Sequence, residues 1–133
     1  MEELNISTKK RNELIDITAD IKEIIEKSGL KEGTCVVYCP HTTAGITINE
    51  GADPDVKKDI LMWLNKLVPE SSDFQHSEGN SDAHIKSSLV GISKTLIVKE
   101  GDLLLGTWQN IYFAEFDGPR KRKVIVKIME DKK

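Results

Sequence analysis

Short strand-like segments recur along most of the 133-residue chain and do not alternate regularly with helical ones. Alternating apolar and polar residues, or a high β-branched and aromatic content, predict about seven strands. They cover residues 4–8, 13–17, 34–39, 43–49, 94–98, 103–116 and 122–129. Because runs of strands with few intervening helices do not build a doubly wound parallel sheet, we predict an α+β fold or a sandwich.

Three other segments have helical patterns, each with a start signal, an apolar stripe and a stop signal. The predicted N-caps are Thr18, Asp53 and Ser81. Pro54 favours the first turn of the second helix, because its φ is already helical. The predicted stops are Gly29, Pro69 and Gly91. The stripes, which we expect to pack into the core, are Ile21, Ile24 and Ile25; Val56, Ile60, Trp63, Leu64 and Leu67; and Ala83, Ile85 and Leu89.

Length and charge restrict the class of protein. A chain of 133 residues suits a single domain, residues 1–133, with its own core. Its 19 basic and 22 acidic residues are interspersed and sum to −3, which gives no support for nucleic-acid or membrane-surface binding. No window is apolar enough for a membrane span, and the amino-terminal segment lacks a signal-peptide pattern. We therefore predict a cytoplasmic protein.

The two cysteines, Cys35 and Cys39, lie four residues apart in a predicted strand. In an extended chain their α-carbons are about 13 Å apart, whereas a disulfide needs roughly 4.4 to 6.8 Å. We predict two reduced thiols in the core. The alternative, Cys39 as a ligand or nucleophile, rests only on the weakly specific tripeptide CPH.

Two of the three histidines lie in one polar segment, HSEGNSDAH, residues 76–84. His41 precedes a predicted strand, His76 lies in a loop and His84 lies in the first turn of a predicted helix. Side chains from separate segments meet at such element ends. Catalytic zinc sites use three protein ligands and one open position, so three converging histidines suggest a metal site. The alternative is ordinary surface histidines, because the spacing H-x7-H is weakly specific.

Polar residues near these histidines are candidates for supporting roles. Glu50, Glu78 and Asp82 could orient the imidazoles or transfer protons. Alternatively, Asn80 is an ordinary loop residue and Ser81 an ordinary helix cap. Asp82 could simply favour the positive end of the third helix.

The segment 106–122 places polar residues on both faces of a predicted strand. A buried strand would need partners for Gln109, Asn110 and Glu115, because an unpaired buried polar group costs on the order of 1 to 3 kcal/mol. One interpretation is a site wall or subunit contact lined by Trp108, Gln109 and Glu115. The other is an ordinary strand with one wet edge.

The residues Asp117 to Arg120, DGPR, predict a hairpin turn, and basic residues continue to Lys123. The simpler interpretation is a solvated hairpin tip. If the tip folds towards the histidines, Arg120 could hold a phosphate or carboxylate with two parallel hydrogen bonds.

Five motifs together resemble the YjbQ family of bacterial and archaeal proteins. They are PHTTAGITINEG (40–51), DPDV (53–56), H...EGNSDAH (76–84), LLLGTWQ (103–109) and EFDGPRKR (115–122). The resemblance extends from DIT at 16–18 to the final strand. Ser81 departs from it, since relatives often carry a small apolar residue there.

The resemblance implies a compact, strand-rich, jelly-roll-like or barrel-like subunit with about three helices outside, assembled as a homotrimer. It implies zinc or another divalent metal at the motif histidines, His41, His76 and His84. Other motif residues would lie around that pocket, within one subunit or between two. They are Glu50, Asn80, Asp82, Trp108, Gln109 and Arg120.

YjbQ proteins are often described as secondary thiamine-phosphate synthases, which are transferases. That reaction calls for a diphosphate pocket and usually Mg²⁺ with oxygen ligands. A three-histidine pocket suits zinc better than magnesium. We therefore expect thiamine-phosphate synthesis to be at most a weak side reaction.

Two functions follow from the residues and the resemblance together. The first is a metal-dependent enzyme acting on a small phosphorylated or carboxylated metabolite. In it, Glu50 or Asp82 acts as the catalytic base or orients the ligands, and Arg120 binds the anion. The second is a non-catalytic, trimeric module that binds a metabolite in the same pocket.

Overall fold

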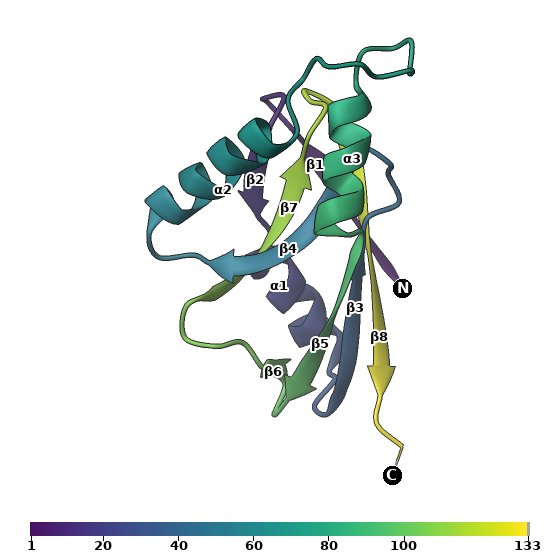
Figure 1. Cartoon of the computed structure of the whole chain (residues 1–133). Helices are drawn as coiled ribbons and strands as arrows, with labels where there is room; N and C mark the ends of the chain where they lie inside the picture. The colour runs from purple at the N-terminus through teal and green to yellow at the C-terminus, as the bar shows by residue number, and fades with distance from the viewer. Residues whose placement is uncertain (133) are drawn as a thin grey trace.

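The computed structural model describes residues 1–132, in which eight strands and three helices are arranged as in Figure 1. The strands are β1 (Glu2–Ser7), β2 (Glu13–Asp16), β3 (Gly33–Tyr38), β4 (Ala44–Glu50), β5 (Ser93–Lys99), β6 (Asp102–Leu103), β7 (Gln109–Glu115) and β8 (Lys121–Glu130). The helices are α1 (Thr18–Ser28), α2 (Pro54–Leu67) and α3 (Ser81–Val90). None of these helices is long and apolar enough to cross a membrane.

The strands form two antiparallel sheets. One has the order β1-β8-β3-β5-β6 and the other the order β2-β7-β4. The main core lies between them and is closed on one side by α1. The predicted α+β, strand-rich and barrel-like fold is confirmed.

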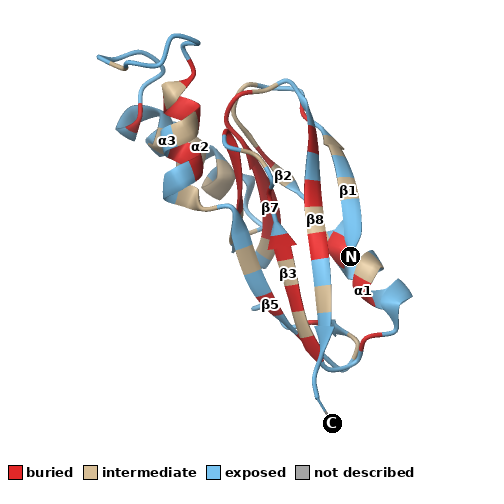
Figure 2. Ribbon diagram, turned by 90° about the vertical axis from the view of Figure 1, so that its right-hand side faces the viewer, coloured by how far each residue is buried: buried red, intermediate tan, exposed pale blue. Residues whose placement is uncertain are grey.

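The main core follows the two-residue period of the strands. Figure 2 shows buried positions alternating with intermediate ones along most of β3 and with exposed or intermediate ones along β8. Cys35 and Cys39 are fully buried and form no disulfide, as predicted. Burial raises the pKa of each thiol to about 11, so both stay protonated at neutral pH. From α1, Ile21 and Ile25 complete this core.

The helices α2 and α3 cover the other face of the three-stranded sheet (Figure 1). The predicted core role of the whole α2 stripe is wrong, because no residue of this helix is fully buried. Ile60 and Leu64 pack against the cluster on the three-stranded sheet, whereas Trp63 and Leu67 are 61% and 60% exposed. The apolar stripe of α2 is therefore wider than the part of the helix that the sheet covers.

The predicted inward face of α3 is right for Ala83 and wrong for Ile85 and Leu89. Ala83 is buried, but Ile85 and Leu89 are exposed. The buried positions are otherwise polar, namely Asp82, Lys86 and Ser87. Each of these side chains forms a hydrogen bond with another segment, so the burial pattern does not follow hydrophobicity.

The predicted caps have mixed outcomes. Asp53 caps α2 as expected, its side chain accepting from Asp55 N–H at 2.9 Å. Thr18 is instead the first residue of α1, and Asp16 accepts hydrogen bonds from its N–H and its hydroxyl. Ser81 likewise opens α3, and Asn80 occupies the N-cap position without a side-chain cap bond.

The segment predicted as one strand over residues 103–116 is interrupted. Strand β6 ends at Leu103, and β7 begins only at Gln109. A turn at residues 107–108 separates them, so the chain passes from the larger sheet to the smaller one.

Candidate functional site: the histidine pocket

Two of the histidines are in contact through their rings. His76 lies in the loop before α3, and His84 lies in the helix itself. Their ring centroids are 5.3 Å apart and the rings are perpendicular, an edge-to-face arrangement.

His41 approaches the same place from the connection between β3 and β4. It lines a shallow pocket of about 560 Å³ together with His84. The other lining residues are Thr42, Ser87, Ser88, Gly91 and Ile92. His84 therefore contacts His76 and shares this pocket with His41, although His76 itself does not line the pocket.

The ring of His41 is already engaged by the protein. Lys123 N–H donates to its Nε2 at 2.9 Å, so this nitrogen is unprotonated. Burial, followed by the charge of Arg122, lowers the pKa of His41. His41 is therefore neutral at neutral pH, but the lone pair of its Nε2 is occupied.

The arrangement does not complete a metal site by itself. Within residues 1–132, no group of three or more His, Cys, Asp or Glu side chains is placed to hold a metal ion. His76 and His84 are adjacent, whereas His41 would have to release the Lys123 N–H. The three-histidine metal site stays a prediction.

The candidate residues Asn80 and Arg120 converge on Asp117. The Asp117 carboxylate accepts from Asn80 Nδ2 at 2.8 Å and from Arg120 Nη2 at 2.9 Å. Arg11 Nη1 lies 3.4 Å away on the other oxygen. These contacts tie the start of α3 to the β7–β8 turn, and about half of the Arg120 side chain remains exposed.

Asp82, a candidate base, is also committed to ion pairs. It accepts from Arg11 Nη2 at 3.0 Å, and its other oxygen lies 3.6 Å from Lys86 Nζ. Lys86 in turn donates to Asn65 and Asn12. Burial lowers the pKa of Lys86, although Asp82 opposes this shift. Since both Asp82 and Lys86 are 1% exposed, this network positions α3, and with it His84.

The remaining candidates lie at the far end of the three-stranded sheet. Glu50 pairs with Gln109 at one end of the β4–β7 ladder, and Ala44 pairs with Glu115 at the histidine end. The seven residues of β4 span about 20 Å from one end to the other. Trp108, 62% exposed, lies beside Gln109. One subunit therefore does not bring the Glu50 group to the histidines.

Sequence reasoning missed Arg122 as a partner for Glu115. Arg122 Nε donates to Glu115 Oε2 at 2.8 Å, and Thr8 Oγ1 donates to the same oxygen at 2.8 Å. The alternation of Arg122 with Val124 and Val126 was the available signal, because all three share the buried face of β8. After burial, the charge of Arg122 lowers the pKa of His41, whereas the charge of Glu115 opposes this shift.

Two antiparallel sheets, three helices and a histidine pocket at one end define a small α+β domain. The family model described as "UPF0047 protein YjbQ-like" matches residues 2–131. The chain belongs to this YjbQ family, as the motifs predict.

Relatives match over nearly their full length. A UPF0047 protein of Methanocaldococcus jannaschii is 62% identical over 127 residues, which cover 96% of this chain and 92% of that protein. The UPF0047 protein YugU of Bacillus subtilis is 54% identical, with 95% and 96% covered.

Solved structures share the fold. A crystal structure of an uncharacterised YjbQ/UPF0047 family protein from Clostridium acetobutylicum is 56% identical, with a TM-score of 0.96 and coverage of 97% of this chain and 100% of that one. A protein of unknown function from Sulfolobus solfataricus is 36% identical, with a TM-score of 0.94 and 98% and 96% covered.

Proposed function

We propose that the histidine pocket is an active site and that the protein is a metal-dependent enzyme acting on a small phosphorylated or carboxylated metabolite. The supporting observation is the position of His84, which contacts the His76 ring and lines the pocket that contains His41. Zinc is the first candidate metal, because imidazole ligands suit it. The proposal requires His41 to exchange its bond from Lys123 for the metal.

Basic residues next to His41 support an anionic substrate. Lys121, Arg122 and Lys123 line a neighbouring groove of about 420 Å³. Arg122 is neutralised by Glu115, and Lys123 Nζ lies 3.7 Å from Glu3 Oε2, whereas Lys121 is exposed and forms no ion pair within residues 1–132. Arg120 also keeps an exposed surface beside its bond to Asp117. These charges favour a phosphate or carboxylate group.

We propose further that the protein works as a homotrimer. Trp63 and Leu67 leave apolar surface exposed on α2, and such surface commonly marks an interface. In a closed ring, a head-to-tail contact could place the Glu50 end of one subunit against the histidine end of another. Light scattering should give three times the chain mass of 14.9 kDa. A monomer mass at all concentrations would contradict this part of the proposal.

Metal analysis tests the central claim. Purified protein is stripped with a chelator, reloaded with Zn²⁺, desalted and analysed for zinc per chain. We expect retention by the wild type and loss in His84→Ala. The control Gln75→Ala changes an exposed neighbour in the same loop and should retain zinc. Absence of zinc from the wild type, or full zinc in His84→Ala, would contradict the claim.

A second candidate function is a non-catalytic module that binds a metabolite. The burial of Asp82 favours it, because a carboxylate paired with Arg11 and Lys86 is poorly available for proton transfer. Thermal-shift screening against phosphorylated metabolites, followed by a product assay on each hit, distinguishes the enzyme from the binding module. The assays include the substrates of thiamine-phosphate synthesis. Ligand binding without turnover in any metal would favour the module.

The proposal includes a cytoplasmic location. Two buried thiols that form no disulfide suit a reducing compartment. Fractionation of cells that produce the protein tests this location directly.

A further inference from the structure

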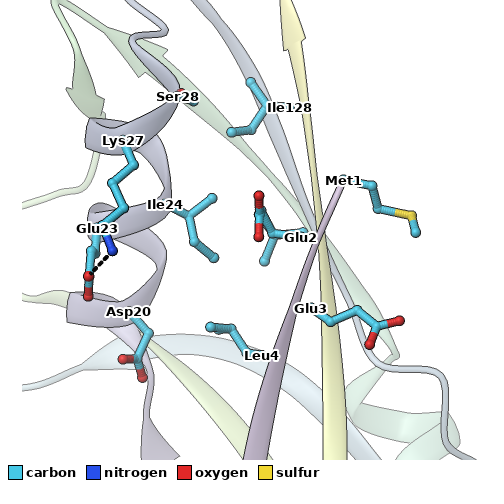
Figure 3. Close-up of a pocket in the computed structure, with 11 residues that line it drawn as sticks. Met1, Glu2, Glu3, Leu4, Asp20, Glu23, Ile24, Lys27, Ser28 and Ile128 are labelled. Atoms are coloured by element: carbon cyan, nitrogen blue, oxygen red, sulfur yellow. Dashed lines mark ion pairs between the residues drawn. The ribbon is translucent and has the colours of Figure 1, made fainter.

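A second concave site lies between α1 and the edge strand β1, and it contains none of the histidines (Figure 3). Its volume is about 430 Å³, within the range of small-molecule sites, roughly 300 to 1,000 Å³. Its apolar wall consists of Leu4, Ile24, Val126 and Ile128. Val126 belongs to the main core and the other three side chains pack against it, so the wall is continuous with that core.

The rim of this α1–β1 cleft is acidic. Its carboxylates are Glu2, Glu3, Asp20 and Glu23, whereas the positive groups are Lys27 and the amino group of Met1. Lys27 Nζ pairs with Glu23 Oε1 at 2.7 Å, and Glu3 Oε2 lies 3.7 Å from Lys123 Nζ.

Two rim carboxylates form no direct ion pair within residues 1–132, although the charge of Glu2, after that of Glu23, helps to raise the pKa of Lys27. In the part of the chain that the structure describes, Glu2 and Asp20 make no ion pair with a side chain, in contrast to Glu23 and Glu3. Figure 3 shows the Glu2 carboxylate in the middle of the cleft opposite Ile24, with Asp20 on the helix below it. A ligand in the cleft would meet negative charge from both walls.

We propose that the α1–β1 cleft binds an aliphatic diamine or polyamine. Its ammonium groups would pair with the carboxylates of Glu2 and Asp20, and its methylene groups would cover Ile24 and the rest of the apolar wall. Charge complementarity excludes the anionic metabolite proposed for the histidine pocket. A hydrated divalent cation matches the wall poorly, because such ions need about six oxygen ligands.

Calorimetric titration of the full chain with spermidine at low ionic strength tests the proposal. Any affinity tag is placed at the carboxyl end, so that Met1 is not extended. We expect saturable binding of one spermidine per chain. Because an exposed ion pair contributes up to about 1 kcal/mol, Glu2→Gln and Asp20→Asn should each raise Kd by roughly fivefold. The control Glu26→Gln removes an exposed charge from the same helix but outside the cleft, and Kd should stay within roughly twofold.

A series of diamines tests the apolar wall. Affinity should rise from 1,3-diaminopropane to 1,6-diaminohexane, by up to roughly fourfold for each added methylene group that is buried. Binding should also remain saturable in MgCl₂, with an affinity equal to that measured in NaCl at the same ionic strength.

Several results would overturn the proposal. One is the absence of saturable spermidine binding, and another is an affinity that does not depend on diamine length. A third is a loss of affinity in Glu26→Gln as large as that in Glu2→Gln. The last is a weakening of binding by MgCl₂ greater than that caused by NaCl at the same ionic strength. The His84→Ala variant should bind spermidine like the wild type. If it does not, the polyamine occupies the histidine pocket and the cleft assignment is wrong.

Discussion

The two faces of β7 differ in how they are covered. On the inner face, Ile111 and Phe113 belong to the apolar core between the sheets. On the outer face, Tyr112 and Ala114 form a smaller cluster under α2 and α3, together with Phe116 just after the strand. The strand is buried on both sides. The inner layer, between the sheets, and the outer layer, under α2 and α3, differ in the kinds of side chain that they contain.

The inner layer is complete within one chain and largely apolar, with the Arg122–Glu115 pair closing one end. The outer layer depends on buried charges such as Asp82 and Lys86 and leaves Trp63 exposed. Apolar burial stabilises without directional demands, whereas buried charges require particular partners. The comparison indicates that the inner layer supplies stability and that the outer layer supplies position and contact surface.

The largest effect of a substitution on stability is expected in the inner layer, where a charged pair lies at one end of the apolar core. Glu115→Ala leaves the Arg122 guanidinium buried without its partner and should reduce the free energy of unfolding by about 3 to 5 kcal/mol. Urea denaturation measures this change. The double variant Glu115→Leu with Arg122→Met removes both charges and should regain most of the loss. A single-variant loss below about 1 kcal/mol would contradict the distinction between the layers.

A smaller effect is expected in the outer layer. Asp82→Ala removes the acceptor for Arg11 and Lys86 and should cost about 1.5 to 3 kcal/mol. Lys86→Met keeps much of the volume and leaves Asp82 paired with Arg11, so the expected cost is below about 1.5 kcal/mol. Thermal and urea unfolding of both variants test the order, and the reverse order would show that Lys86 is the main support.

The Asp117 carboxylate should make the outer layer sensitive to acid. Burial alone raises its pKa, but hydrogen bonds from Asn80 and Arg120 outweigh burial and lower the pKa below 3.8. A lowered folded-state pKa gives stability that is present above the unfolded-state pKa and is lost as the pH falls through the folded-state value.

Asp117→Asn should therefore cost about 1 to 2 kcal/mol at pH 7. The difference from the wild type should shrink as the pH falls below about 4. Unfolding free energies measured from pH 7 to pH 2 test this trend. A difference that stays constant or grows in acid would show that the charge of Asp117 is not the cause.

The smallest effect on the stability of a single chain is expected at the exposed α2 surface. Trp63→Gln should change the unfolding free energy of a dissociated chain by no more than about 0.5 kcal/mol. Sedimentation should nevertheless show weaker self-association than in Lys58→Gln, an exposed change on the same helix. Unchanged association of Trp63→Gln would place the subunit contact elsewhere.

Much of the fold was predictable because its signals are local. The strand period placed Cys35 on the buried face of β3, and Asp53 with Pro54 marked the start of α2. Gly29 ends α1 with φ +74°, a left-handed conformation that favours glycine. Such features depend on neighbouring residues alone, so sequence patterns report them.

Candidate residues were predictable by type, but their grouping was not. The sequence marked three histidines at element ends, and only the tertiary structure brought His84 to both His76 and His41. It also separated Glu50 from them by the length of β4.

The buried face of α3 shows the same division between local and long-range information. Hydrophobic spacing pointed Ile85 inward, yet contacts from Arg11, Asn12 and Asn65 made the polar side of the helix the buried one. Residues so far apart in sequence leave no periodic signal of their contact, because chain topology rather than local spacing brings them together. The sequence alone therefore determined the elements and their chemistry, and the tertiary structure decided which of those groups meet.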